Sequence, residues 1–165
     1  MAAAREALER FRRVYGDEHQ DTLTAVSNMG FLLQAERKFD EAEHYLRRHN
    51  DMDASHPEAW EMLGRAIVIP AQQQLQQTAA SPKWIADSLR QRIEEADVCF
   101  SKAETLLASS ENQRELKFTL INRGVARTLL GRFDDARQDY EYALRIDPYL
   151  QEVMRNLGSL YLHTG

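Results

Sequence analysis

The side chains that could support catalysis are scattered along this 165-residue chain. Its histidines form neither a HExxH pair nor part of a nucleophile elbow, and no glycine-rich phosphate loop accompanies them. The segment from His49 to Asp53 carries possible metal ligands, but no glutamate completes a calcium loop there, and an Asx-rich turn explains it better. We therefore expect no enzymatic activity, no metal site and no cofactor.

The single cysteine and the charge balance exclude further classes. Cys99 cannot form an internal disulfide, and its apolar neighbours predict a packed thiol and not a nucleophile. The net charge of −5 disfavours a nucleic-acid partner, because such proteins usually display a basic stripe. The amino terminus lacks the apolar core of a signal peptide, and the longest apolar run, 66–71, is too short to cross a bilayer. We expect a cytoplasmic protein that binds neither nucleic acid nor membrane.

Two arginines, Arg123 and Arg127, lie four residues apart and therefore share one face of the helix expected there. They could reach the carboxylates of Glu94, Glu95 or Asp97 on a neighbouring helix, or they could meet an acidic ligand. We favour internal pairing.

The elements that must position these side chains are indicated by a repeat. Four short strings ending in glycine recur, and their glycines are Gly30, Gly64, Gly124 and Gly158. The first and last intervals are both 34 residues, which is a period of helix–turn–helix repeats, and the middle interval is 26 residues longer. One helix pair cannot bury its own apolar face, so neighbouring pairs are expected to stack.

The third copy resembles the tetratricopeptide-repeat family. Its matching residues are Leu120, Gly124, Gly131, Phe133, Ala136, Tyr140, Ala143 and Pro148, and the second copy has the signature Trp60-x-x-Leu63-Gly64. The resemblance implies an all-α fold, a right-handed α-solenoid of antiparallel helix pairs. Residues 5–21 also resemble the longer linker of kinesin-light-chain-type repeats.

We expect a single domain over residues 1–165. Its expected parts are the second helix of a partial repeat (2–15), repeat 1 (21–50), repeat 2 (57–109, with an insertion at about 70–92), repeat 3 (114–146), and the first helix of a truncated fourth repeat (149–165). The last helix is apolar around much of its circumference. This predicts either a fragment of a longer repeat protein or self-association through that helix.

The insertion is expected to lengthen both helices of the second pair by roughly ten residues, so that a hairpin arm projects about 15 Å. Ser81-Pro82 is a favourable helix start, and an apolar stripe from Ile85 to Leu107 predicts one long second helix. Pro70 should kink or end the first helix. The alternative is a loose glutamine-rich loop.

The resemblance places the first helix of each pair on the inner wall of a concave groove. An asparagine ladder in such a groove could hold a peptide backbone, although the asparagines could also cap or bridge helices, and the apolar members could be core. The lysine and asparagine arrangement of the chaperone-tail carboxylate clamp is absent. Counting from each glycine predicts these groove residues: Asn28, Phe31, Met62, Arg65, Phe118, Asn122, Val125, Arg155 and Asn156.

The function predicted on these grounds is a protein-interaction scaffold that binds a peptide or protein segment in the groove. The alternative is a self-associating, architectural module of a larger multidomain protein.

Overall fold

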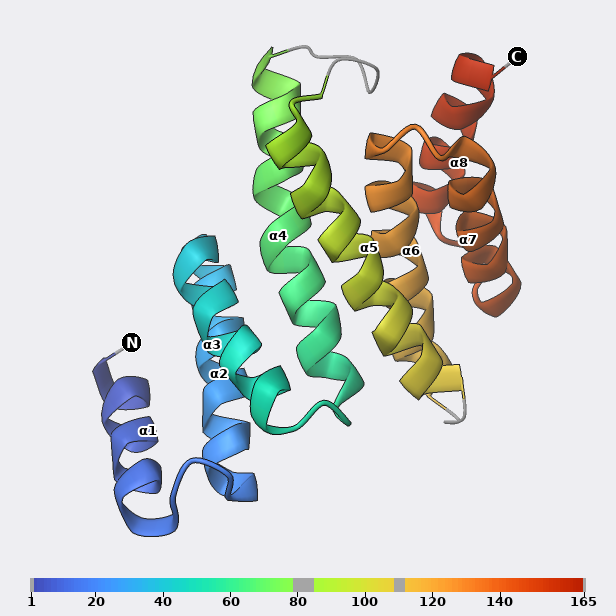
Figure 1. Ribbon diagram of the computed structural model, residues 1–165. Coiled ribbons are helices and arrows are strands. Elements are labelled where there is room, and N and C mark those ends of the chain that lie inside the picture. Colours follow the sequence, from blue (N-terminus) through green and yellow to red (C-terminus); the bar gives the residue numbers. More distant parts are fainter. Residues whose placement is uncertain (1, 79–84, 109–111, 165) are drawn as a thin grey trace.

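The computed structural model describes residues 2–78, 85–108 and 112–164. Within these ranges every regular element is an α-helix (Figure 1). In chain order the helices are α1 (Ala2–Tyr15), α2 (Gln20–Ala35), α3 (Phe39–Met52), α4 (Pro57–Thr78), α5 (Asp87–Ala108), α6 (Gln113–Leu129), α7 (Phe133–Ile146) and α8 (Gln151–Thr164).

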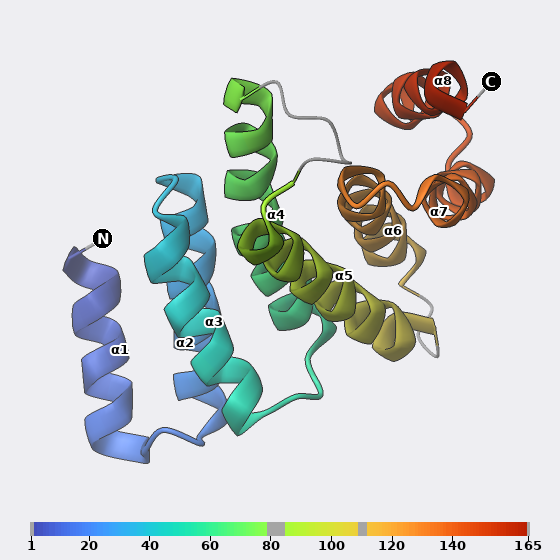
Figure 2. The ribbon, with the colours of Figure 1, turned by 45° about the horizontal axis from the view of Figure 1, so that its top comes forward.

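The helices stack as antiparallel pairs into an α-solenoid. The pairs are α2 with α3, α4 with α5, and α6 with α7, and α1 and α8 pack on the two ends of the stack. In Figure 2, α3 and α5 lie in front of α2 and α4. Helix α4 also contacts both α2 and α6 directly, so the first helices of the pairs form a layer of their own.

Three of the repeat glycines occupy equivalent places, each against a buried side chain of the paired helix. A Cβ atom on Gly30 would lie 2.7 Å from Leu46, and one on Gly124 would lie 2.5 Å from Tyr140, 16 residues further along in both cases. Gly64 faces Phe100 in the same way, 20 residues later than in the other pairs because of the insertion. The small residue is therefore needed for close helix contact within each pair.

The turns inside the first and third pairs are also equivalent. Arg37 and Gly131 each follow the repeat glycine by seven residues, and both have positive φ, 59° and 75°. The backbone N–H of each donates back to the helix, as do those of Lys38 and Arg132, which is the pattern of a Schellman C-terminal motif. The first pair thus places an arginine in a conformation that favours glycine.

Replacing Arg37 with glycine should raise the free energy of unfolding by about 0.5–1 kcal/mol, because it removes the left-handed conformational penalty of a residue with a Cβ atom. The side chain of Arg37 is exposed. Gly131→Ala, at the equivalent turn, should lower the free energy of unfolding by a similar amount. Urea unfolding of both variants tests this, and a destabilised R37G would contradict it.

Both helices of the second pair are longer than the others, although within the described residues the extension is smaller than the roughly ten residues expected: α4 and α5 have 22 residues each, whereas the other helices have 14 to 17. Of the two effects expected of Pro70, a kink or an end of the helix, the second does not occur, since α4 continues to Thr78. Buried Ile67, Ala71 and Leu75 pack against α5 on both sides of the proline, and this burial offsets the missing hydrogen bond. Residues 72–78 are consequently helical and not a loose loop.

The second long helix was expected to start at Ser81-Pro82, and these two residues lie outside the described ranges. Ile85 and Ala86 precede α5 without helical structure, so the stripe beginning at Ile85 is not carried by one helix. Ile85 is nevertheless buried in the core together with Leu89 and Ile93 of α5.

A buried ion network joins α5, α6 and α7. Arg123 donates to Asp139 at 2.7 Å and also to Glu104, and Arg127 bridges Asp97 at 2.9 Å and Asp139 at 2.8 Å. Burial alone would lower the pKa of Arg123, but its hydrogen bonds to Asp139 and Glu104 raise that pKa above the ordinary value. The expected internal pairing is confirmed for Asp97, whereas the main partner, Asp139, was not anticipated.

The other two carboxylates expected near these arginines pair elsewhere, and the thiol is buried. Glu95 pairs with Arg47 at 2.5 Å, and Glu94 lies 3.6 Å from Arg132, so neither reaches Arg123 or Arg127. Cys99 is buried, and that burial raises the pKa of its thiol to about 12. It is a packed thiol, as predicted.

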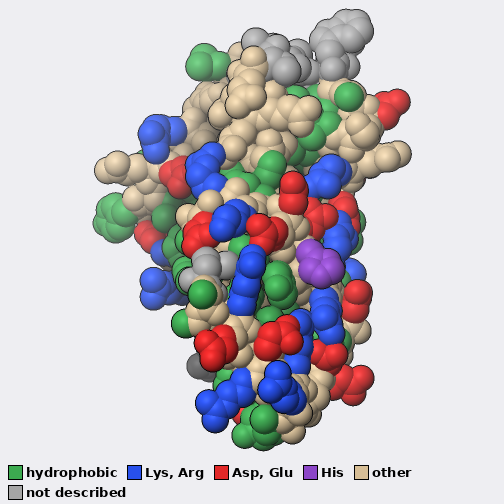
Figure 3. All heavy atoms as spheres, turned by 90° about the vertical axis from the view of Figure 1, so that its left-hand side faces the viewer, with side chains coloured by type: hydrophobic (Ala, Val, Ile, Leu, Met, Phe, Trp, Pro, Cys, Tyr) green, Lys and Arg blue, Asp and Glu red, His purple; other side chains and the backbone are tan. Residues whose placement is uncertain are grey.

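The end helices present partly apolar outer faces. On α1, Phe11 and Val14 line a hollow, and on α8 Leu162 is 88% exposed. The side of the molecule at the left of Figure 1, seen directly in Figure 3, carries positive and negative side chains interspersed with scattered apolar ones. In the described part of the chain, no helix combines the length and hydrophobicity needed to cross a membrane.

Candidate functional site

A pocket of about 170 Å³ lies between the first helices of the second and third pairs. Its walls come mainly from α4 and α6, with one residue from the end of α5. The lining residues are Pro57, Glu58, Glu61, Arg65, Leu107, Glu115, Phe118 and Thr119.

Helical periodicity explains why these side chains share one cleft. Glu58, Glu61 and Arg65 are spaced three and four residues apart, so they project from one face of α4. Glu115 and Thr119 are likewise four residues apart on α6. The two faces oppose each other because α4 and α6 are in direct contact.

Glu61 is the electrostatic centre of the pocket. Its Oε1 accepts a hydrogen bond from Asn122 Nδ2 at 2.8 Å, and Arg65 Nε lies 3.9 Å away. Burial raises the pKa of the Glu61 carboxyl, and the nearby charge of Glu115 raises it further, although Arg65 and Asn122 act in the opposite direction. The charge of Glu61 is thus only partly compensated by the protein itself.

Among the described residues that line the pocket, two carry a polar atom that has no hydrogen-bond partner and no contact with solvent. These atoms are Oε2 of Glu115 and the hydroxyl oxygen of Thr119. Thr119 is fully buried. Buried polar groups are normally paired, and leaving one unpaired costs about 1–3 kcal/mol. The pocket therefore has unused hydrogen-bonding capacity.

Three predicted groove residues are brought together here. Arg65 and Phe118 line the pocket, and Asn122 borders it through its hydrogen bond to Glu61. Phe118 is 45% exposed. Asn122 is therefore engaged with a neighbouring helix, which is the bridging alternative considered for the asparagines.

The remaining predicted residues lie elsewhere on the first helices. Asn28 and Phe31 of α2 are exposed, the latter by 58%, and Arg155 of α8 is exposed as well. Asn156 is half-buried and hydrogen-bonds with Tyr140, whose pKa is raised to about 12 by burial despite that bond.

Met62 and Val125 contribute less surface than the count from the glycines suggested. Both are half-buried. Met62 packs against the core, and its backbone oxygen accepts a hydrogen bond from Gln34 Nε2 at 2.7 Å. The apolar surface offered by the predicted set is therefore mainly that of Phe31 and Phe118.

Glu115 and Thr119 were not anticipated as site residues. Glu115 lies about one helical turn before Phe118, the first predicted groove residue on α6. A threonine at position 119 does not by itself indicate a binding site. A continued count at three- and four-residue steps back from Asn122 would have reached both.

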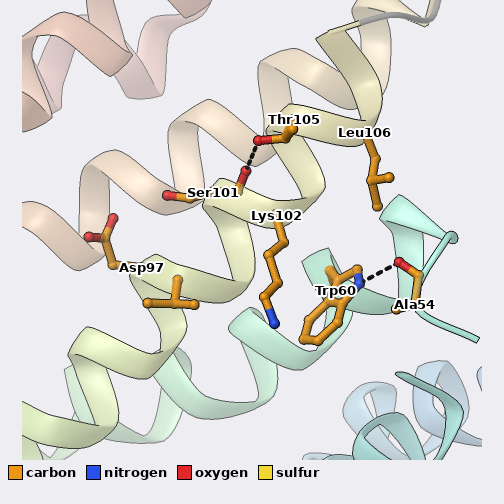
Figure 4. Close-up of a pocket in the computed structure, with 8 residues that line it drawn as sticks. Ala54, Trp60, Asp97, Ser101, Lys102, Thr105 and Leu106 are labelled. Carbon is orange, nitrogen blue, oxygen red and sulfur yellow. Dashed lines mark hydrogen bonds between the residues drawn. The ribbon is translucent and has the colours of Figure 1, made fainter. Parts of the chain in front are cut away.

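A second hollow lies beside Trp60 and is lined by α5 (Figure 4). Trp60 Nε1 donates to the Ala54 oxygen at 2.9 Å, and Lys102 Nζ lies 3.9 Å from the ring centre. Trp60 is only half-buried, so it does not fill the wedge between helices as completely as Leu63 does.

The segment from His49 to Asp53 is mostly helical, which corrects the expectation of a turn. His49 to Met52 form the last turn of α3, and only Asp53 caps it. Asp53 Oδ1 accepts hydrogen bonds from the backbone and hydroxyl of Ser55, which is an Asx turn. Among the described residues, no group of three or more histidine, cysteine or acidic side chains is arranged to hold a metal ion.

Comparison with known proteins supports this architecture. A tetratricopeptide-repeat family model matches residues 118–150. Transcription factor tau subunit sfc4 of Schizosaccharomyces pombe is 26% identical over 159 residues, a match that covers 83% of this chain. The chain spans only about 15% of the length of that curated relative.

Solved structures of tetratricopeptide-repeat domains share the fold at low identity. The first such domain of Spaghetti (RPAP3), bound to the HSP90 peptide SRMEEVD, has a TM-score of 0.68 at 18% identity, covering 88% of this chain and 95% of that one. The Arabidopsis OM64 domain has a TM-score of 0.67 at 13% identity, covering 87% and 97%. The second domain of human RPAP3, in complex with the HSP70 peptide SGPTIEEVD, has a TM-score of 0.61 at 20% identity, covering 82% and 92%.

These likenesses establish the fold, whereas the kinesin-light-chain-like character of the amino-terminal end stays a prediction. The chain has the all-helical α-solenoid fold of tetratricopeptide-repeat domains.

Proposed function

We propose that this chain is a non-catalytic scaffold that binds a peptide or protein segment along the layer formed by α2, α4 and α6 and onto α8. The observation that carries the proposal is the pocket between α4 and α6, where exposed Phe118 adjoins polar groups without partners. Concave surfaces that combine apolar area with a few polar groups are typical binding sites. Two of the structurally similar domains are in complex with peptides.

The proposed site follows the repeats. We assign α2 and α3 to repeat 1, α4 and α5 to repeat 2, α6 and α7 to repeat 3, and α8 to a fourth repeat. Of the three predicted ladder asparagines, Asn28 is the exposed one, whereas Asn122 and Asn156 have partners within the protein. Aromatic contact at Phe31 and Phe118 is therefore a larger part of the proposed binding surface than an asparagine ladder.

A peptide-array screen of the wild type and a Phe31→Ala/Phe118→Ala variant tests the function. Both rings are exposed, so their removal should leave the fold intact while peptides lose about tenfold or more in affinity, as expected for aromatic binding residues. Tyr149→Ala is the matched control, because Tyr149 is 87% exposed but lies in the turn before α8. Equal binding by the wild type and the double variant would contradict the proposal.

A second candidate is self-association through α8, favoured by its exposed Met154, Tyr161 and Leu162. Sedimentation over a dilution series of the unliganded protein distinguishes the two. A concentration-dependent dimer that Leu162→Ser disperses would support self-association, and a monomer throughout would oppose it.

A further inference from the structure

The pocket between α4 and α6 has an excess of negative charge. Among the described residues that line it, Glu58, Glu61 and Glu115 carry carboxylates, and Arg65 is the one cation. Arg65 lies 3.9 Å from Glu61, too far for a hydrogen bond. Lys117 is adjacent on α6, but its ammonium group is paired with Asp147 at 2.6 Å.

The unpartnered atoms identify what kind of group is missing. Glu115 Oε2 is an acceptor, and the Thr119 hydroxyl can accept as well as donate, yet neither has a partner. A hydrogen-bond donor that entered the pocket would supply what the protein lacks. The terminal torsion of a glutamate is soft, so Glu115 can turn its free oxygen toward such a donor at little cost.

We propose that this pocket receives the cationic side chain of an arginine or lysine from the bound peptide. The proposal rests on the peptide-binding function above and specifies its ligand. A guanidinium or ammonium group would meet Glu61 and Glu115 directly, forming charge-assisted hydrogen bonds. The half-exposed ring of Phe118 stands in the wall, where it can contact the stem or the face of the cation.

The size of the pocket suits one side chain. A cavity of about 150 Å³ holds a benzene ring, and this pocket measures about 170 Å³. The chemistry differs from that of the peptides bound to the similar domains, which end in Glu-Glu-Val-Asp. A carboxylate placed between Glu61 and Glu115 would be repelled, so an acidic tail should be excluded from this pocket.

Binding of degenerate nine-residue amidated peptides tests the inference. Three libraries carry arginine, its neutral isostere citrulline, or glutamate at the central position, and the readout is fluorescence anisotropy with labelled peptides. We expect the wild type to bind the arginine library at least tenfold more tightly than the citrulline library and the glutamate library least of all. A Glu61→Gln/Glu115→Gln variant should reduce the arginine-to-citrulline ratio to near one.

The control variant is Glu141→Gln, which removes a carboxylate from α7, away from the pocket, and should keep the wild-type ratio. Circular dichroism confirms that each variant is folded, and if the double variant does not fold, the Glu115→Gln single variant gives the same comparison. Equal binding of arginine and citrulline libraries, or a preference that persists without the two glutamates, would overturn the cation pocket while leaving peptide binding in place. Failure of all three libraries to bind would remove both proposals.

Discussion

Replacing Arg123 with methionine should lower the free energy of unfolding by about 3 kcal/mol, because it leaves a buried carboxylate without its main partner. Arg123 and Asp139 are 6% and 3% exposed, and three hydrogen bonds join the two side chains. Methionine keeps the length and apolar packing of the arginine stem, so the lost stability reports the charge and not a cavity. Urea unfolding measures the effect.

The matched control is Arg137→Met. Arg137 makes an ion pair on α7 with Asp134 at 2.9 Å, but the Asp134 side chain is 83% exposed, and surface pairs contribute between about 0 and 1 kcal/mol. If R123M and R137M are equally stable, the network does not stabilise the packing of α5, α6 and α7. Arg123→Lys should fall between the wild type and R123M, since a lysine keeps the charge but cannot reproduce the planar fork.

The repeat register could be predicted from the sequence because it depends on a steric rule. Glycine is required where the first helix of a pair lies against Leu46 or Tyr140 of the second helix, because a Cβ atom would clash there. The same requirement in each pair explains why glycine recurs at a fixed interval in the sequence. The ends of the insertion could not be predicted in this way. Pro70 favours a helix end locally, but the burial of Ile67 and Ala71 on either side of it favours a continuous helix. Which of the two effects is larger depends on packing against α5, and the sequence alone does not give that packing.

The candidate site could be predicted only in part for a related reason. Counting from the glycines finds side chains on the correct face of one helix, which was enough for Arg65 and Phe118. It does not give distances between helices, and these decide that Asn122 bonds with Glu61 and that Glu115 has an unpaired oxygen. The acidic character of the pocket is thus a property of the α4–α6 contact and not of either repeat alone.

Replacing Gly124 with alanine should lower the free energy of unfolding by about 1–2 kcal/mol, since the cost of overpacking exceeds the gain of about 1 kcal/mol in helix propensity. The added Cβ would lie 2.5, 2.8 and 2.9 Å from three atoms of the Tyr140 ring. That ring cannot move aside easily, because it is 1% exposed and its hydroxyl bonds with Thr128 and Asn156.

Gly158 provides the matched control for this substitution, because it occupies the same register position in α8 but has nothing within 4 Å of its Cβ site. Gly158→Ala should therefore be neutral or stabilise by up to about 1 kcal/mol through helix propensity alone. Gly30→Ala should lose less than G124A, as the leucine it meets can change rotamer more easily than a hydrogen-bonded tyrosine ring. Thermal and urea unfolding of the three variants measure the order of their stabilities. A G124A protein as stable as G158A would show that close contact between α6 and α7 does not require glycine, and the steric origin assigned to the repeat would then be wrong.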